Sequence, residues 1–299
     1  MMTPDRADGA GLTAALLSVL LWQAGLIVQK LLVADTNSGS LMLIQVGAAA
    51  ALMWCALLAT GRLPPLDRKT SLNVAWGIMA PGLVFGLGIA GAARSDGVSI
   101  AVLWGLLPLL GPVLARLVLR ETLHWTFPLG GMLALGGLAL MLSNRAATGE
   151  GDWIGNLLVF CSVCCASLSS VIARFINRGR DAWFPAATLQ LTGASLTGIA
   201  IVLASGWHPP HFDSGATLLS LSYLILGMTV LNYVAFNFAL SRLAVSWVGL
   251  SAATAPVVGL CMAWLFLGSV ITTVDLAAAA IILLGVALPH LRRVGISAA

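Results

Sequence analysis

Long apolar runs recur through this chain, and they limit its fold more than any other feature. A helix of about 20 apolar residues spans the roughly 30 Å hydrocarbon core of a bilayer. Only helices and closed barrels satisfy their backbone hydrogen bonds there, and the two-residue alternation of barrel strands is absent. The runs therefore predict an all-α polytopic membrane protein with ten transmembrane helices. We place these helices at residues 12–33, 40–60, 72–92, 98–119, 125–143, 154–175, 183–204, 217–239, 246–267 and 272–290.

The composition excludes a soluble fold. Hydrophobic residues make up 59% of the 299 residues and charged residues only 9%, and the mean hydropathy is +0.99. A soluble domain has too little interior to hide so much apolar material. The net charge of +4 comes from basic residues scattered over short loops, so we expect a lipid bilayer and no nucleic acid as the partner.

A tandem repeat links the two halves of the chain. Residues 94–142 match the residues 148 positions later, and earlier segments match at offsets of 144 and 145. Five helices per half is an odd number, so the halves must enter the membrane in opposite directions. This predicts two inverted five-helix repeats (5+5), residues 1–147 and 148–299. The matched pairs include Arg94 with Arg242, Pro108 with Pro256, Gly111 with Gly259, Lys30 with Arg174 and Gln45 with Gln190.

The basic residues also predict an orientation. With the N-terminus inside the cell, only Lys30, Arg94 and Arg145 of the 15 lysines and arginines fall on the outer side. Short cytoplasmic loops carry the excess of Lys and Arg in membrane proteins. We therefore expect a multi-pass protein of the inner (plasma) membrane with both termini in the cytoplasm.

Catalytic and metal-binding chemistry finds no support in the predicted helices. All four histidines lie in loops or at helix ends, and no carboxylate lies in the middle of a helix. An enzyme site needs acids, bases, nucleophiles or metal ligands gathered in a pocket. We therefore predict no enzyme activity, no catalytic residues, no metal and no cofactor.

Uncharged polar and aromatic residues inside the helices are the candidates for binding a substrate. Trp22 and Trp104 lie too deep for the interfacial belt, so they either pack the bundle or line a cavity. Amides are costly facing lipid, whereas serines and threonines at this depth mostly bond a helix backbone. The polar candidates are Gln23, Gln45, Gln190, Asn232, Tyr233, Asn237, Ser251 and Thr254, of which Asn232, Tyr233 and Asn237 form the densest cluster.

Prolines inside the helices add a second kind of candidate. Each removes a backbone donor, frees a carbonyl and favours a kink. Pro108 and Pro256 are related by the repeat, and broken helices near the midplane commonly line the site of an inverted-repeat carrier. We include both in the predicted substrate site.

These features together resemble the drug/metabolite transporter (DMT) superfamily, and within it the EamA-repeat exporters. The resemblance rests on ten short helices in two repeats and on a proline 13 residues before a glutamate, Pro108 and Glu121. The second half departs from this pattern, because Ser269 stands where the glutamate is expected. The nearest likeness is to YddG-like exporters of aromatic amino acids. The family resemblance implies a central cavity built from helices 1–4 and 6–9, with helices 5 and 10 set apart.

The sequence thus predicts an alternating-access carrier that exports small amphipathic metabolites, with aromatic or neutral amino acids as the leading substrates, and that works as a monomer. The absence of midplane charge argues against strongly ionic substrates. Two alternatives stay open. One is a multidrug exporter of lipophilic compounds, and the other, from a different class, is a membrane-embedded scaffold or lipid-modifying enzyme.

Overall fold

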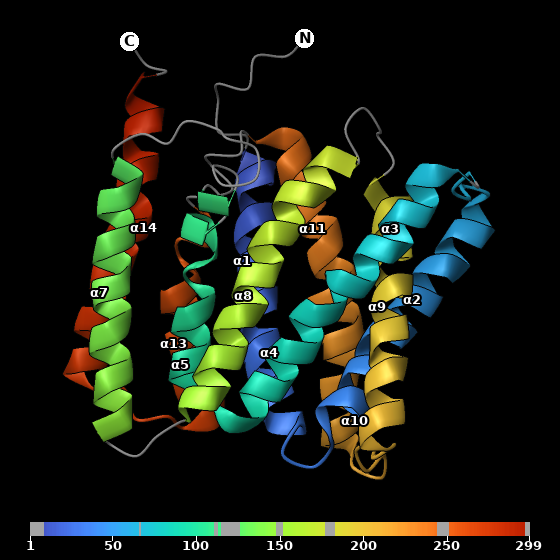
Figure 1. Cartoon of the computed structure of the whole chain (residues 1–299), viewed down its shortest axis with the longest axis horizontal. Coiled ribbons are helices and arrows are strands. Elements are labelled where there is room, and N and C mark those ends of the chain that lie inside the picture. Colours follow the sequence, from blue (N-terminus) through green and yellow to red (C-terminus); the bar gives the residue numbers. More distant parts are fainter. Residues whose placement is uncertain are drawn as a thin grey trace.

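The computed structural model describes residues 9–65, 67–110, 113–114, 126–147, 152–176, 183–243 and 251–296. Over these ranges the chain is helical and contains no strand. The helices stand side by side (Figure 1). They are α1 (Gly9–Leu32), α2 (Ser38–Thr60), α3 (Arg68–Met79), α4 (Gly82–Arg94), α5 (Gly97–Trp104), α7 (Thr126–Ala147), α8 (Trp153–Ile176), α9 (Trp183–Ser205), α10 (Gly215–Ser222), the π-helix η1 (Tyr223–Leu231), α11 (Asn232–Arg242), α13 (Ala255–Leu267) and α14 (Thr273–Ile296).

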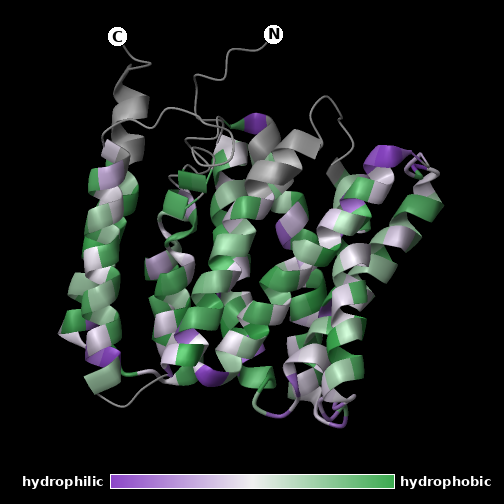
Figure 2. Cartoon of the chain, in the orientation of Figure 1, coloured by the Kyte–Doolittle hydropathy of each residue, from purple (hydrophilic) through white to green (hydrophobic). Residues whose placement is uncertain are grey.

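Six described stretches are long and apolar enough to cross a membrane, and four shorter apolar helices accompany them. Apolar residues dominate the body of the bundle, whereas polar residues gather toward its two ends (Figure 2). This confirms the prediction of an all-α polytopic membrane protein. The long stretches are Gly9–Leu32, Ser38–Thr60, Arg68–Arg94, Pro128–Ala147, Phe184–Ser205 and Gly215–Phe236, and the shorter helices are Gly97–Leu110, Trp153–Ser169, Ala255–Leu267 and Thr273–Leu288.

The third predicted helix of each half is not a single regular helix. Residues 72–92 divide into α3 and α4 at Ala80 and Pro81, where the peptide bond is cis. In the second half, residues 217–239 run through α10, η1 and α11, so a π-helix occupies the middle of the stretch. The break at Pro81 has a local cause, since proline removes a backbone donor and clashes with the preceding turn.

The fourth predicted helix of each half is also interrupted. α5 ends at Trp104, Gly105 and Leu106 form a turn, and residues 107–110 are helical again. In the second half, Ala253 and Thr254 form a turn before α13. The rest of these predicted helices, including residues 115–119 and 246–250, lies outside the described residues.

Polar residues in the connections between helices cap the N-terminus of the helix that follows. Asn37 accepts a hydrogen bond from the N–H of Ser40, and Asp67 accepts one from Thr70, each over 2.8 Å. Asp96 accepts hydrogen bonds of 2.9 Å from the N–H groups of Val98 and Ser99. These side chains satisfy N–H groups that have no partner inside the helix. Asn37, Asp67 and Asp96 therefore act as N-caps.

The most extensive helix pairs each join one helix from before residue 147 to one from after residue 152. α7 packs on α14, α4 on α8, α2 and α3 on α9, α1 on α11, and α5 on α13. Figure 1 shows α7 and α14 together at one end of the molecule, beside α5 and α13. The two halves therefore interlock, and the buried core lies between them.

Candidate functional site

Three aromatic rings from three helices meet in the interior. The Trp22 ring on α1 lies 4.8 Å from the Trp104 ring at the end of α5, edge to face at 65°. The ring of Phe85 on α4 lies 5.9 Å from Trp22, tilted by 49°. Trp104 is only 4% exposed, and Trp22 is partly buried. We call these three residues the aromatic cluster.

The indole nitrogens of this cluster have no hydrogen-bond partner among the described residues. The Nε1 atoms of Trp22 and Trp104 are buried and find no acceptor in the part of the chain that the structure describes. A buried donor left unpaired costs about 1–3 kcal/mol, so native proteins rarely leave one without a role. Two such donors lie on adjoining rings, and their contact with a substrate stays a prediction.

Gln23, the next residue on α1, joins the first half to the second. Its Nε2 donates to the backbone oxygen of Ala255 over 2.6 Å. Its Oε1 is buried and has no donor among the described residues, and Gln23 is 1% exposed. Gly259 on α13 leaves room for this side chain, because a Cβ at residue 259 would lie only 3.3 Å from Gln23 Nε2.

The two predicted prolines follow matching turns. The turn at Gly105 and Leu106 precedes Pro108, and the turn at Ala253 and Thr254 precedes Pro256. The two turns lie 148 residues apart, at equivalent positions of the repeat. Pro256 is buried and Pro108 is partly buried. The prediction of broken helices at both prolines is therefore confirmed by the backbone.

Ser251 and Thr254 belong to the turn before Pro256. Thr254 donates from Oγ1 to the backbone oxygen of Ser251 over 2.7 Å, and Ser251 is 4% exposed. The Thr254 hydroxyl therefore stabilises the turn that interrupts the helix. Any contact of these two residues with substrate stays a prediction.

A chain of buried amides runs from α1 to the π-helix. Gln29 donates from Nε2 to Gln45 Oε1 over 2.8 Å, and Gln45 donates from Nε2 to Thr229 Oγ1 over 3.1 Å. Thr229 in turn donates to the backbone oxygen of Leu224, five residues earlier, over 2.8 Å. The amides of Gln29 and Gln45 and the hydroxyl of Thr229 are all at most 2% exposed. Gln45 thus joins α1, α2 and η1.

Gln190 and Asn232 make similar links between helices. Gln190 on α9 donates to Asn73 Oδ1 on α3 over 3.0 Å. Asn232 on α11 accepts from the hydroxyl of Ser18 on α1 over 2.6 Å. Tyr233 is partly buried, and the side chain of Asn237 lies outside the described residues. In this conformation the two amides hold helices together, so contact with substrate stays a prediction for them.

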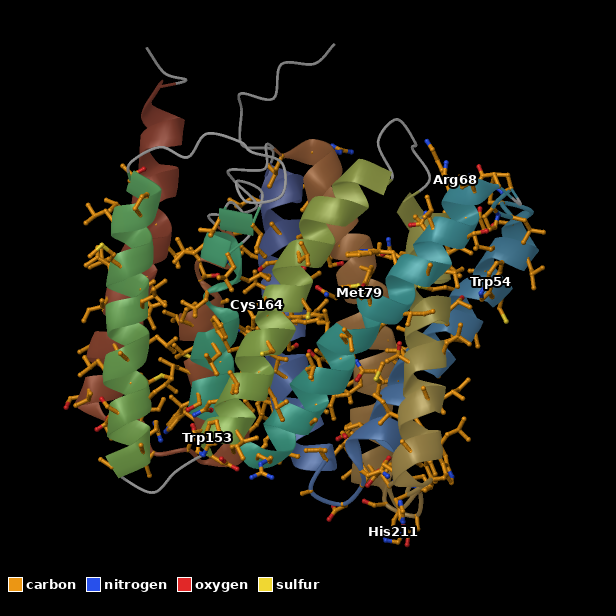
Figure 3. The ribbon with its side chains drawn as sticks, in the orientation of Figure 1. Trp54, Arg68, Met79, Trp153, Cys164 and His211 are labelled. Carbon is orange, nitrogen blue, oxygen red and sulfur yellow. The ribbon has the colours of Figure 1, made fainter. Side chains whose placement is uncertain are left out.

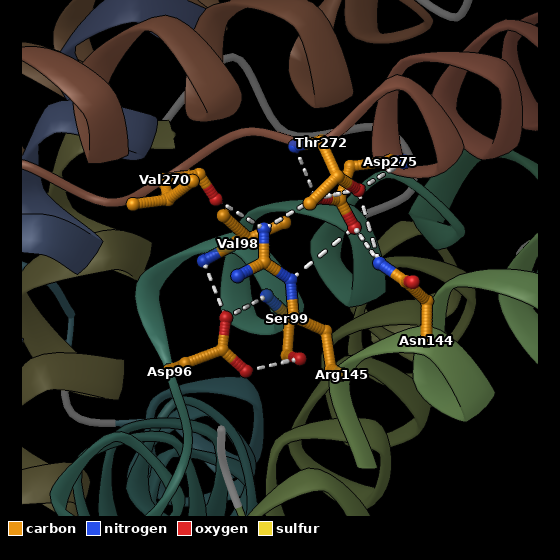
Figure 4. Close-up of polar contacts among 8 residues, drawn as sticks. All are labelled: Asp96, Val98, Ser99, Asn144, Arg145, Val270, Thr272 and Asp275. Atoms are coloured by element: carbon orange, nitrogen blue, oxygen red, sulfur yellow. Dashed lines mark hydrogen bonds and ion pairs between the residues drawn. The ribbon is translucent and has the colours of Figure 1, made fainter. Parts of the chain in front are cut away.

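A buried ion pair was not among the predicted features (Figure 4). Arg145, near the end of α7, donates from Nη2 to Asp275 Oδ2 over 2.6 Å and to the backbone oxygen of Val270 over 2.9 Å. Arg145 is 2% exposed and Asp275 0%. Thr272 also donates to Asp275, from its N–H and its hydroxyl, each over 2.8 Å. The sequence held a signal for this pair, because the two opposite charges lie at the same predicted side of the membrane. Each stands at an end of the fifth predicted helix of its half.

The fold, with its long apolar helices and their polar side chains in the interior, defines a multi-pass membrane protein. The model of the EamA-like transporter family matches twice, at residues 9–143 and 153–289. The chain therefore belongs to the EamA-like transporter family, within the DMT superfamily.

Two individual proteins are similar to this chain, one in sequence and one in fold. It is 27% identical over 190 residues to the "Uncharacterized transporter YdfC" of Bacillus subtilis (strain 168), a match that covers 62% of this chain and 60% of that protein. A protein of known crystal structure superimposes with a TM-score of 0.69 at 20% identity, over 96% of this chain and 99% of that one. At this identity the structural likeness shows the fold alone.

Proposed function

We propose that this protein exports small amphipathic metabolites across the inner membrane by alternating access, and that aromatic or neutral amino acids are its leading substrates. The observation that carries the proposal is the aromatic cluster with its two unpartnered indole N–H groups. Aromatic faces stack favourably on the ring of a substrate. The indole N–H groups and the free Oε1 of Gln23 offer both donors and an acceptor to a zwitterion.

The helix contacts support an inverted repeat. α1 packs on α11 and α13, and its counterpart α8 packs on α4 and α5. Likewise, α2 contacts η1, and its counterpart α9 contacts α4. Each of these contacts between the halves thus has an equivalent with the two halves exchanged. The family model also matches the two halves separately, which supports repeats at residues 1–147 and 148–299.

Individual residues also make equivalent contacts in the two halves. Ser162 on α8 donates to the backbone oxygen of Val84 on α4, and its counterpart Ser18 on α1 donates to Asn232 on α11. A Cβ at Gly155 would lie 2.8 Å from Arg94 Cβ, and a Cβ at Gly11 would lie 2.9 Å from Arg242 Cβ. Two halves that pack by the same contacts can exchange conformations, as alternating access requires.

The direction of insertion follows from the charges. The start of α1 and the end of α14 lie at the same end of the bundle (Figure 1). Arg68 lies at that end too, whereas Trp153 and His211 lie at the other (Figure 3). The excess of Lys and Arg near the first end supports a cytoplasmic location for it. We propose that one such chain is a complete carrier.

Flux into protein-only liposomes tests the proposal. Radiolabelled phenylalanine, leucine, lysine and a lipophilic cation are offered separately to vesicles with and without the protein. We expect saturable uptake of phenylalanine and leucine and little of the other two. Saturable uptake of the cation alone would favour multidrug export, and no uptake of any compound would favour a scaffold or an enzyme.

A further inference from the structure

Gln23 differs from the other buried glutamines in how its amide is used. Its Nε2 is held by Ala255, whereas its Oε1 faces no donor in the described chain. Gln45, by contrast, uses its Oε1 and its Nε2 in the amide chain. Gln23 is also adjacent in sequence to Trp22 of the aromatic cluster. One end of a buried amide is thus fixed to the protein, and the other end is free for a ligand.

We propose that Gln23 determines specificity by accepting a hydrogen bond from the amine of the substrate. This inference rests on the proposed function and names the group of the substrate that this residue recognises. Because Nε2 is held by Ala255, the amide has a fixed direction and presents an oxygen. An oxygen selects a donor, and a site built to bond a polar group discriminates strongly against analogues that lack it.

The rest of the cluster complements this assignment. The two unpaired indole N–H groups are donors, so they fit the carboxylate of an amino acid, whereas Gln23 Oε1 fits its ammonium. Trp104 belongs to α5, as does Ala101, whose backbone oxygen lies 3.5 Å from Gln23 Nε2. The Gln23 amide, on α1, therefore lies beside the helix that carries the Trp104 ring. A molecule with an ammonium, a carboxylate and a ring has a partner for each group.

The fixed end of Gln23 connects this contact to a broken helix. Ala255 directly precedes Pro256, at the turn that interrupts the fourth helix of the second half. The equivalent contact in the other half joins the hydroxyl of Ser167 to the backbone oxygen of Leu107, which directly precedes Pro108, over 3.5 Å. The Gln23 contact is shorter by about 0.9 Å, from 2.6 Å against 3.5 Å. Gln23 thus connects a bound substrate to the broken helix of the second half through the shorter of these two contacts.

A substrate-by-variant cycle in liposomes tests the proposal. Flux efficiencies are measured for phenylalanine and for 3-phenylpropionate, which lacks the amine, with the unmodified protein and with Gln23→Leu. The ratio between the two compounds should be roughly tenfold larger in the unmodified protein than in Gln23→Leu, because the variant has no oxygen for the amine. Comparing ratios removes the intrinsic difference between the two compounds.

Gln29→Leu is the matched control, a buried glutamine on the same helix that is bonded within the amide chain. It should slow both compounds and leave their ratio unchanged. Gln23→Glu is the second variant, since it keeps an acceptor oxygen and cannot donate to Ala255, so it should keep the discrimination at a lower rate. It also serves if Gln23→Leu does not fold.

The outcomes separate this inference from the function on which it rests. An unchanged ratio in Gln23→Leu, or a ratio lost in Gln23→Glu, overturns the role of Gln23 and leaves amino acid export standing. Absence of phenylalanine flux with the unmodified protein overturns the proposed function, and the inference with it. A ratio lost equally in Gln29→Leu would assign the effect to general loosening of α1.

Discussion

At the scale of single residues, Trp104 illustrates how a buried polar atom can mark a candidate site. Its ring is almost fully buried among apolar side chains, yet its N–H lacks an acceptor among the described residues. We expect Trp104→Ala to weaken aromatic substrates more than aliphatic ones, by about 1 kcal/mol, because only aromatic substrates lose a ring contact. Competition between phenylalanine and leucine in liposomes measures the difference. Equal losses for both would return Trp104 to a packing role.

The ion pair between Arg145 and Asp275 gives a prediction about stability. Asp275→Asn should lower the free energy of unfolding by about 3–5 kcal/mol, because it leaves the buried guanidinium of Arg145 uncompensated. Thermal unfolding in detergent, followed by the loss of monodisperse protein, measures this. Replacing both residues by apolar ones of similar volume should recover much of the loss. A single variant as stable as the unmodified protein would contradict the assignment.

The exposed pair between Arg94 and Asp152 is the natural control. A hydrogen bond from the N–H of Ile154, together with Arg94, holds the pKa of Asp152 below its usual range. The contribution of this pair to stability is therefore complete at neutral pH and is lost only as the pH falls through this lowered pKa. The Arg94 side chain is 51% exposed, and exposed ion pairs contribute little. Asp152→Asn should barely change thermal stability at pH 7.

At the scale of helices, the contact between α5 and α13 depends on glycine. A Cβ at Gly259 would lie 2.4 Å from Ala101 Cβ, and one at Gly105 would lie 2.3 Å from Pro256 Cγ. Gly259→Ala should therefore destabilise the protein by about 1–3 kcal/mol through overpacking and reduce flux. Gly136→Ala on α7, where a Cβ meets nothing within 4 Å, is the control. The thermal stability and the flux of both variants are measured. Equal stability and equal flux for the two would contradict the prediction.

The interrupted helices show which elements position the aromatic cluster. Phe85 lies four residues after Pro81, and Trp104 is the last residue of α5 before its turn. Irregular backbone at membrane depth is tolerated only inside protein or along a cavity. Both interruptions in the first half therefore lie where a substrate site is expected. Their counterparts are η1 and the turn before Pro256.

At the scale of the whole molecule, the orientation leads to a simple test. Reporter fusions after Gly206 should read outside the cell, and fusions at the C-terminus should read inside. The structure supports opposite readings, because the end of α14 and the loop with His211 lie at opposite ends of the bundle (Figures 1 and 3). A C-terminus that reads outside would contradict the orientation derived from the basic residues.

Energy coupling is the second prediction at this scale. Proton-driven carriers usually hold an ionisable group inside the membrane. Asp275 is bound by Arg145 and Thr272, and Glu121 lies outside the described residues. We expect flux down the substrate gradient without a pH gradient, and little change in rate when a pH gradient is collapsed. Accumulation driven by a pH gradient alone, and abolished by Glu121→Gln, would overturn this expectation.

The sequence by itself determined the helical membrane fold, because long apolar runs have few other solutions in a bilayer. It also located the helix breaks near Pro108 and Pro256, because proline lacks a backbone N–H and its ring clashes with the preceding turn wherever it stands. The tertiary structure decided which polar side chains are already paired. Gln45, Gln190 and Asn232 form hydrogen bonds across helices, whereas Trp22, Trp104 and Gln23 keep buried atoms without a partner in the described part of the chain. Such partners lie far apart in sequence, as with Arg145 and Asp275, so only packing brings them together.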